Sequence, residues 1–254
     1  MADVILKAAG LGIAFGGLHA LSKFNTEIRE GELVGLIGPN GAGKTTVFNL
    51  FTGVYQPTAG EFFLFGHRMN GKKTHELVHA GIARTFQNIR LFKKMTVLEN
   101  VMISFTSRLK YNMFHSLLRT NSFWQEEEGG RLRAIELLSA FNLQDKADMT
   151  AESLPYGQQR KLEIARALAT NAKMLLLDEP AAGMNPTETS ELLECINNIR
   201  RDFLVTILLI EHDMSLVMRI CERIIVLDYG EIIAEGGPEE ISHNPKVIAA
   251  YLGE

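Results

Sequence analysis

The chain has 254 residues, of which 46% are hydrophobic and 22% are charged, and its formal net charge at pH 7 is −4. This length and composition are typical of a soluble protein with a full hydrophobic core, in one large domain or two smaller lobes. The small acidic surplus argues against a nucleic-acid-binding protein, which normally carries a basic excess on one face.

The amino end has no basic region followed by a long apolar stretch, and no window reaches the roughly 18 consecutive apolar residues of a membrane-spanning helix. We therefore expect the chain itself to stay outside the bilayer. The two cysteines, Cys195 and Cys221, lack the spacing of metal ligands. Both are expected to be reduced thiols, without a disulfide framework.

Short apolar runs bounded by turn residues recur along the chain, at residues 32–37, 174–177, 203–210 and 223–227. Such runs are typical of strands buried on both faces of a parallel sheet, and helical segments lie between them. Residues 224–235 contain two β-rich runs around Gly230, which predicts a hairpin. The chain is therefore predicted to be α/β, with a sheet that becomes mixed near its end.

Between about residues 105 and 150 the pattern becomes helical, with Leu132, Ile135, Leu138 and Phe141 at three-residue steps. We expect a helical subdomain inserted in the α/β core and broken at residues 129–130, where two glycines follow three glutamates. The last residues, 236–254, predict a turn, a short capped helix and a tail.

One glycine-rich segment, "GPNGAGKTT", follows the apolar run "LVGLI" and precedes a helical pattern, which is the setting of a phosphate-binding loop. Glycines let successive N–H groups point at phosphate oxygens, and the following helix adds positive potential. Lys44 is predicted to reach the β and γ phosphates of ATP, and the Thr45 hydroxyl to bind Mg²⁺. The predicted loop comprises Gly38, Pro39, Asn40, Gly41, Ala42, Gly43, Lys44, Thr45 and Thr46.

A second acidic motif, "MLLLDEP", supplies carboxylates at the end of a predicted buried strand. Asp178 is predicted to hold Mg²⁺ through a water molecule. Glu179, one residue further, is placed to orient or deprotonate an attacking water. Together with the phosphate loop, this motif predicts a nucleoside triphosphatase.

The stretch "LPYGQQRKLEIARAL", directly upstream of "NAKMLLLDEP", resembles the signature region of ATP-binding cassette (ABC) ATPases. In that family the signature helix of one subunit points its amino end at the γ-phosphate of ATP bound by a second subunit. The resemblance implies that the start of this helix is an anion site for a partner's nucleotide. The signature residues are Leu154, Pro155, Tyr156, Gly157 and Gln158.

The resemblance covers nearly the whole chain and implies three further roles. Phe15 matches the aromatic residue that stacks on adenine. Gln87 matches the glutamine that senses Mg²⁺ and the attacking water, and His212 matches the histidine that touches the γ-phosphate. The implied domains are an α/β core with an antiparallel part at residues 1–86 and 172–235, a helical subdomain at 87–171 and a tail at 236–254.

Two positions depart from the family pattern. Pro155 replaces the usual serine, so a hydroxyl and a backbone N–H are missing there, and the remaining N–H groups must bind the anion. Asn185 stands where an aspartate is usual, which leaves any charged role there open, although an uncharged side chain still forms hydrogen bonds.

The proline-tyrosine signature, the "AAGMNP" loop and the long helical insert look most like the ATPase subunits of branched-chain amino-acid importers. That resemblance implies a second ATPase subunit, two multi-span permeases and a periplasmic binding protein for leucine, isoleucine or valine. It places the chain peripherally on the cytoplasmic face of the inner membrane. The segment "IRLFKKMTV", with Leu91, Phe92, Lys93 and Lys94, is the predicted surface for the permease.

Other functions remain open at this point. A cassette ATPase acting on ribosomes or DNA usually has two cassettes or a long coiled coil, and this chain has neither. A lipid exporter is expected to keep the serine and glycines of the signature, and a phosphate-loop kinase has no use for it. An ATPase of a related amino-acid or urea transporter, and pairing with itself or with a sister subunit, are not distinguished.

Overall fold

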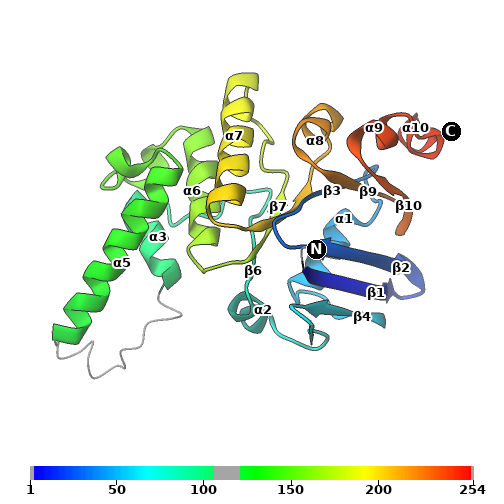
Figure 1. Cartoon of the computed structure of the whole chain (residues 1–254), viewed down its shortest axis with the longest axis horizontal. Coiled ribbons are helices and arrows are strands. Elements are labelled where there is room, and N and C mark those ends of the chain that lie inside the picture. The colour runs from blue at the N-terminus through cyan, green and yellow to red at the C-terminus, as the bar shows by residue number, and fades with distance from the viewer. Residues whose placement is uncertain (1–2, 106–120, 253–254) are drawn as a thin grey trace. The chain divides into compact units, whose positions relative to one another are not determined.

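The computed structural model describes residues 3–105 and 121–252 (Figure 1). Its contacts divide the chain into two compact units. Unit 1 takes the described residues of Met1–Arg84, Lys173–Pro180 and Arg200–Glu254. Unit 2 takes those of Thr85–Ala172 and Ala181–Ile199. The chain therefore passes from unit 1 to unit 2 twice, and the domain boundaries expected from the sequence remain a prediction.

Unit 1 contains a six-stranded sheet in the order β10-β9-β3-β8-β7-β6, in which β10 alone runs antiparallel to its neighbour. Every residue of β3, β7 and β8 is buried, which explains why these strands are apolar throughout instead of alternating. The predicted α/β fold with a mixed sheet is confirmed. The strands are β3 (Leu33–Ile37), β6 (Ile82–Arg84), β7 (Met174–Asp178), β8 (Thr206–Ile210), β9 (Arg223–Asp228) and β10 (Glu231–Gly236).

Two details of these strands depend on turn residues. The β9–β10 hairpin is confirmed, with Tyr229 and Gly230 as a two-residue turn in which both φ angles are positive. The run predicted to begin at residue 203 is wrong at its start, because β8 begins at Thr206. Leu204 has a φ of 51° and is 68% exposed, so it forms a turn before the strand.

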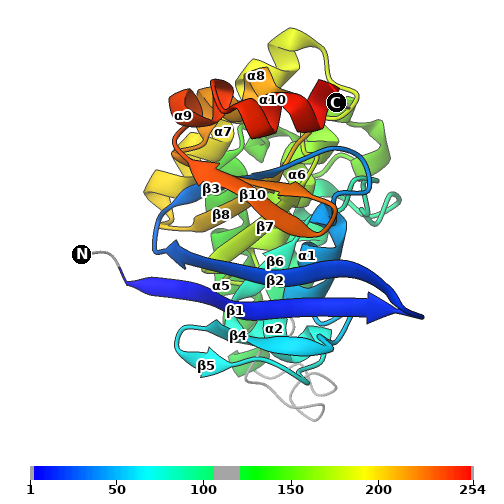
Figure 2. The same cartoon turned by 90° about the vertical axis from the view of Figure 1, so that its right-hand side faces the viewer.

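A second, antiparallel sheet in unit 1 has the order β2-β1-β4-β5 (Figure 2). Its strands are β1 (Val4–Phe15), β2 (Leu18–Arg29), β4 (Ala59–Leu64) and β5 (His67–Arg68). Phe51 of α1 (Lys44–Phe51) packs between Phe24 and Phe62 of this sheet, with ring centroids 6.2 and 5.5 Å away. The helix after β3 thus contributes to the core beneath the antiparallel strands.

The other helices of unit 1 are short: α2 (Thr74–Ala80), α8 (Met214–Ile220), α9 (Pro238–Ser242) and α10 (Pro245–Leu252). The predicted single helix near the carboxyl end is in fact two. Asn244, whose carbonyl accepts from the N–H of Ile248, lies between them, and Pro238 and Pro245 each begin a helix.

Unit 2 is helical, with α3 (Val97–Phe105), α5 (Asn121–Ala140), η2 (Gln144–Lys146), η3 (Ala151–Ser153) and α6 (Tyr156–Leu168), joined by most of α7 (Pro186–Asp202). Helices α3, α5 and α6 pack on one another. This confirms the predicted helical subdomain over the described residues. Residues 106–120 of the predicted lobe lie outside them.

One expectation for α5 is wrong. Helix α5 continues through residues 129–130, because each helical glycine costs only roughly 1 kcal/mol and the two together do not end a helix of 20 residues. The three-residue steps fall on a helix as predicted, but at about 100° per residue each step drifts by about 60°, so these residues do not share one face. Leu132 is accordingly 64% exposed, whereas the buried residues are Ala134, Leu137 and Leu138 of the helix and Phe141 just after it.

Candidate functional site

The groups predicted to act on nucleotide converge in unit 1 at the carboxyl ends of neighbouring parallel strands. The phosphate loop follows β3, Asp178 is the last residue of β7 with Glu179 next, and His212 follows β8. Register places Ile210 of β8 opposite both Leu36 and Asp178. The carboxyl edge of a parallel sheet is the usual ligand-binding edge of α/β folds, and this register builds the site there.

The phosphate loop requires glycine at two positions. A Cβ on Gly38 would lie 2.0 Å from the carbonyl oxygen of Leu227, which allows no side chain. Gly43 has a φ of 106° and precedes α1 as its N-cap, and a Cβ there would approach the Ala20 carbonyl to 2.9 Å. The loop is therefore held against β2 and β9, with its N–H groups at the start of α1.

Lys44 lies inside the loop. Its side chain is buried, and its Nζ donates to the carbonyl oxygens of Gly38 at 2.7 Å and Pro39 at 2.9 Å. Burial lowers the pKa of Lys44, and the charges of Glu179 and Asp178 oppose that shift. The ammonium and the two carboxylates thus act on one another electrostatically.

A cavity of ≈ 330 Å³ opens over this loop. Its wall includes Leu18, His19 and Tyr229, none of which the sequence singled out as a site residue. Tyr229 is 88% exposed at the tip of the β9–β10 hairpin, where Gly230 donates to the Ala42 carbonyl. The other lining residues are Ala20, Asn40, Gly41, Ala42, Gly43, Lys44, Thr45, Thr46, Glu179 and Ile210.

Phe15, predicted to stack on adenine, ends β1 and is 45% exposed. Its ring packs edge-on against Tyr55, with centroids 5.2 Å apart and planes at 70°. It is not one of the residues that line the cavity over the phosphate loop. An exposed aromatic side chain is thus present at this position, three residues before Leu18.

Glu179 and His212 approach each other at the end of β7 and β8. Nδ1 of His212 lies 3.7 Å from Oε2 of Glu179, and the two side chains are 63% and 21% exposed. Glu179 has a φ of 45°, and its N–H donates to the Ile210 carbonyl at 2.9 Å. A non-glycine residue held at positive φ is a form of local strain that clusters at functional sites.

The residue after His212 has a separate, structural role. Asp213 caps α8, accepting from the N–H of Ser215 at 2.9 Å and of Leu216 at 3.4 Å. Its bond with the Ser215 side chain is the main cause that lowers the pKa of Asp213. The cap fixes the backbone that follows His212.

Asp178 has a partner that the sequence did not reveal. Oδ2 of Asp178 accepts from a terminal nitrogen of Arg84 at 2.6 Å, and the two side chains are 10% and 7% exposed. The other terminal nitrogen of Arg84 donates to Oδ1 of Asn49 on α1 at 2.7 Å. No sequence signal marks this arginine, because its partners lie 35 and 94 residues away.

The predicted metal ligands of unit 1 fit Mg²⁺ by their chemistry. Thr45 offers a hydroxyl and Asp178 a carboxylate, and hard cations prefer such oxygen donors. Over residues 3–105 and 121–252, no group of three or more His, Cys, Asp or Glu side chains is placed to hold a metal ion. Mg²⁺ commonly uses only one or two carboxylates and takes the remaining oxygens from nucleotide phosphates and water.

The signature lies in unit 2. Helix α6 begins at Tyr156, and Pro155 precedes it in an extended conformation without a side-chain cap. The first N–H groups of any α-helix have no partner within the helix, so this end offers donors to an anion. Gly157 is buried, and a Cβ there would lie 3.2 Å from Oε1 of Glu188 on α7.

Asn185, which stands where an aspartate is usual, caps helix α7. Its Oδ1 accepts from the N–H of Glu188 at 3.0 Å, and its own N–H donates to Oε2 of Glu188 at 3.1 Å. This reciprocal pair is a capping box at the start of α7, with Pro186 as the first helical residue. The amide oxygen caps the helix as an aspartate would.

The loop that carries Gln87 is also in unit 2, where Gln87 is exposed. Arg160 of α6, 1% exposed, donates to the carbonyl oxygens of Phe86 and Gln87 and forms a 2.9 Å ion pair with Glu163. Glu163 in turn accepts from the N–H of Arg90 at 3.0 Å. The signature helix therefore holds the backbone of this loop.

The predicted permease surface follows directly along the chain. Phe92 is 48% exposed, Lys93 and Lys94 are exposed, and Leu91 is half-buried. Asn100 of α3, fully buried, accepts from the Phe92 N–H at 2.9 Å and donates to the Phe92 carbonyl at 3.0 Å. An ordered backbone thus presents this aromatic and cationic surface.

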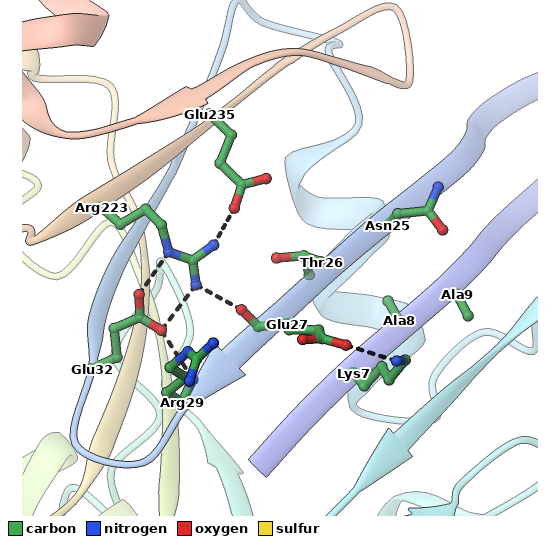
Figure 3. Close-up of a pocket in the computed structure, with 10 residues that line it drawn as sticks. All are labelled: Lys7, Ala8, Ala9, Asn25, Thr26, Glu27, Arg29, Glu32, Arg223 and Glu235. Carbon is green, nitrogen blue, oxygen red and sulfur yellow. Dashed lines mark hydrogen bonds and ion pairs between the residues drawn. The ribbon is translucent and has the colours of Figure 1, made fainter. Parts of the chain in front are cut away.

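A second cavity, of ≈ 520 Å³, lies in unit 1 beside the end of β2, the start of β9 and the middle of β1 (Figure 3). Arg223 of β9 lies between Glu32 and Glu235 and donates to both, and it also donates to the Glu27 carbonyl at 2.7 Å. These bonds raise the pKa of Arg223 above its ordinary value, and the bond to Glu32 contributes most. The network ties the end of β2 to β9 and β10.

No helix in residues 3–105 or 121–252 combines the length and apolarity needed to cross a membrane. The sequence model of the ABC transporter family matches residues 21–182, and that of the branched-chain amino acid ATP-binding cassette transporter matches residues 231–254. The chain belongs to the ABC transporter family. It is an ATP-binding cassette, an ATPase in which hydrolysis is coupled to transport.

Among its relatives is the high-affinity branched-chain amino acid transport ATP-binding protein LivG of Escherichia coli, 48% identical over all of both chains. The ADP conformation of the cassette MJ1267 has a TM-score of 0.86 and 33% identity, covering 99% of this chain and 100% of that one. A dimeric, post-hydrolysis structure of the cassette MJ0796 with ADP and Pi has a TM-score of 0.75 and 28% identity, covering 92% and 99%. These similarities confirm the ABC ATPase fold.

Proposed function

We propose that this chain is the ATPase subunit that powers import of branched-chain amino acids, leucine, isoleucine and valine, through a membrane permease complex. The observation that carries the proposal is the 48% identity with LivG over the full length of both chains. The match of residues 231–254 to the branched-chain cassette family supports it at the carboxyl end. The amino acid itself is assigned to the permeases, because the site in this chain is one for a nucleotide.

In this proposal the loop from Gly38 to Thr46 binds the phosphates of ATP, with Phe15 against the adenine. Lys44 lies at 2.7–2.9 Å from its loop carbonyls and close to two carboxylates, so its ammonium is held where the β and γ phosphates enter. Thr45, Asp178 and Gln87 would hold Mg²⁺, which would neutralise charge that develops on the phosphoryl group.

Hydrolysis is assigned to Glu179, His212 and Gln87. Glu179 orients or deprotonates the attacking water, and His212, 3.7 Å from its carboxylate, contacts the γ-phosphate. Gln87 senses both the metal ion and the water. Its loop is carried by Arg160 of the signature helix, so the position of this glutamine depends on the helix.

The signature, Leu154 to Gln158, faces the γ-phosphate of a second ATPase subunit, and the partner's signature faces the ATP of this chain. Since Pro155 has no N–H, the amides of Tyr156 and Gly157 and the helix dipole bind the anion, which is worth up to about 2 kcal/mol when partly buried. ATP binds the closed pair more tightly than the open one, and this difference drives the conformational change.

The complex we propose contains two such ATPase subunits, two multi-span permeases and a periplasmic binding protein. The chain then lies peripherally on the cytoplasmic face of the inner membrane. Leu91, Phe92, Lys93 and Lys94 contact the permease, since an exposed aromatic beside two cations suits a protein surface near anionic lipid headgroups.

The test is uptake of radiolabelled leucine in cells that lack the chain and carry it back as the unsubstituted form, Lys44→Ala or Glu179→Gln. Neither variant is expected to restore uptake, while the Glu179→Gln protein should still bind ATP. Lys72→Ala, which removes an exposed lysine paired with Glu76, is the control and should restore it fully. Full uptake with Lys44→Ala contradicts the proposal. Co-purification with ribosomes instead of multi-span partners would favour the other class of cassette ATPase.

A further inference from the structure

The further inference concerns Arg84, the last residue of β6. Its guanidinium is 7% exposed and joins two elements of the nucleotide site. One terminal nitrogen donates to Oδ2 of Asp178 at 2.6 Å, and the other donates to Oδ1 of Asn49 on α1 at 2.7 Å. The guanidinium carbon also lies 5.3 Å from the centre of the Phe48 ring. The side chain is fixed from three directions.

Each of these contacts belongs to an element with a role in the site. Asn49 and Phe48 are on the helix that starts with Lys44, and Asp178 is the carboxylate at the end of β7. A guanidinium is planar and donates in a fixed fork, so it sets an angle as well as a distance between α1 and the Asp178 carboxylate.

Lys44 does not orient the Asp178 carboxylate in this way. Its ammonium donates to the carbonyls of Gly38 and Pro39, and its influence on Asp178 is electrostatic. Arg84 by contrast bonds directly to the carboxylate, in a place where both side chains are at least nine-tenths buried. Removing one partner of such a pair leaves a buried charge without compensation and frees its orientation.

We propose that Arg84 is a positioning residue that orients the Asp178 carboxylate for Mg²⁺ and so sets the affinity of the ATP-bound site for the metal ion. The proposal rests on the metal role given to Asp178 under the proposed function. Groups that orient a metal ligand typically contribute about 10–100-fold to metal affinity. A simple charge effect has the opposite sign, because a cation beside the site repels Mg²⁺.

The test is binding of a fluorescent ATP analogue, mant-ATP, as Mg²⁺ is titrated into the purified chain. In Arg84→Met the half-saturating Mg²⁺ concentration is expected to rise about 10–100-fold, while mant-ATP binding in EDTA changes less than about twofold. Arg84→Lys keeps the charge and loses the fork, so the expected rise is smaller than in Arg84→Met but still above about twofold. Arg68→Met, which removes an exposed arginine paired with Glu61 at 2.7 Å, should change nothing.

The outcomes separate this proposal from the proposed function. A half-saturation within twofold of the unsubstituted protein, or a lower one, in Arg84→Met overturns the role of Arg84. If that variant does not fold, the same result in Arg84→Lys is decisive. Asp178→Asn tests the metal role of Asp178 itself. An unchanged Mg²⁺ requirement in that variant removes this metal role and with it the proposal for Arg84, whereas an effect in Asp178→Asn without one in Arg84→Met removes only the proposal for Arg84.

Discussion

Replacing Arg160 with methionine tests how strongly the signature helix holds the loop of Gln87. The guanidinium is 1% exposed and donates to the carbonyls of Phe86 and Gln87, and its ion-pair partner Glu163 is 3% exposed. Methionine leaves the Glu163 charge buried without its cation, and removing one partner of a buried pair costs about 3–5 kcal/mol. We expect a loss of that size in the free energy of unfolding.

The assay is urea unfolding followed by far-ultraviolet circular dichroism, which reports the helices of the unit that contains Arg160. Adding Glu163→Gln to Arg160→Met removes the stranded charge, so the double variant should recover on the order of 2 kcal/mol. Arg131→Met is the control, since this arginine is exposed on α5, and its loss should stay within about 0.5 kcal/mol. A loss below about 1 kcal/mol in Arg160→Met, or no recovery in the double variant, refutes this reasoning.

Three further predictions follow from the described contacts. Gly157→Asp puts a carboxylate where a Cβ alone would lie 3.2 Å from Oε1 of Glu188, so hydrolysis should stop while mant-ATP binding persists, and surviving phosphate release would show that the signature does not face phosphate. Asn185→Ala removes the cap of α7 and should cost about 1 kcal/mol by urea unfolding, whereas Asn185→Asp should cost almost nothing; equal losses would deny the cap. Burial raises the pKa of Cys221 from 9.0 to about 12, so the unfolded chain releases a proton that the folded thiol keeps, and stability should fall as pH rises above about 9. Cys221→Ala should show a smaller decline over that range, and an identical slope would contradict the shift.

The sequence predicts the parts of this protein whose causes are local. Strand β3 lies within an apolar run because both of its faces are buried, and the phosphate loop is marked by closely spaced glycines, of which Gly38, Gly41 and Gly43 all have a positive φ. The turn at Gly230 follows in the same way from the positive φ that a two-residue hairpin needs. Each of these signals is contained within about ten residues.

The parts that the sequence does not predict depend on partners far away in the chain. Nothing in the sequence distinguishes Arg84 from the other arginines. The pairing of β6 with β7 brings it to Asp178. The sequence indicates a turn around Gly230, next to Tyr229, but only the fold places Tyr229 beside the phosphate loop. In α5 the burial of Leu138 and the exposure of Leu132 depend on how the helix packs within unit 2.

The positive φ of Glu179 has a consequence for protein engineering. A glutamate held at a φ of 45° costs the folded state about 1 kcal/mol or more, and glycine would carry no such penalty. A screen that rewards only heat resistance would therefore favour substitution at the residue to which we assign water activation. Thermostable variants of this cassette should be sought with that codon kept constant, because here tolerance to heat and turnover select for different amino acids.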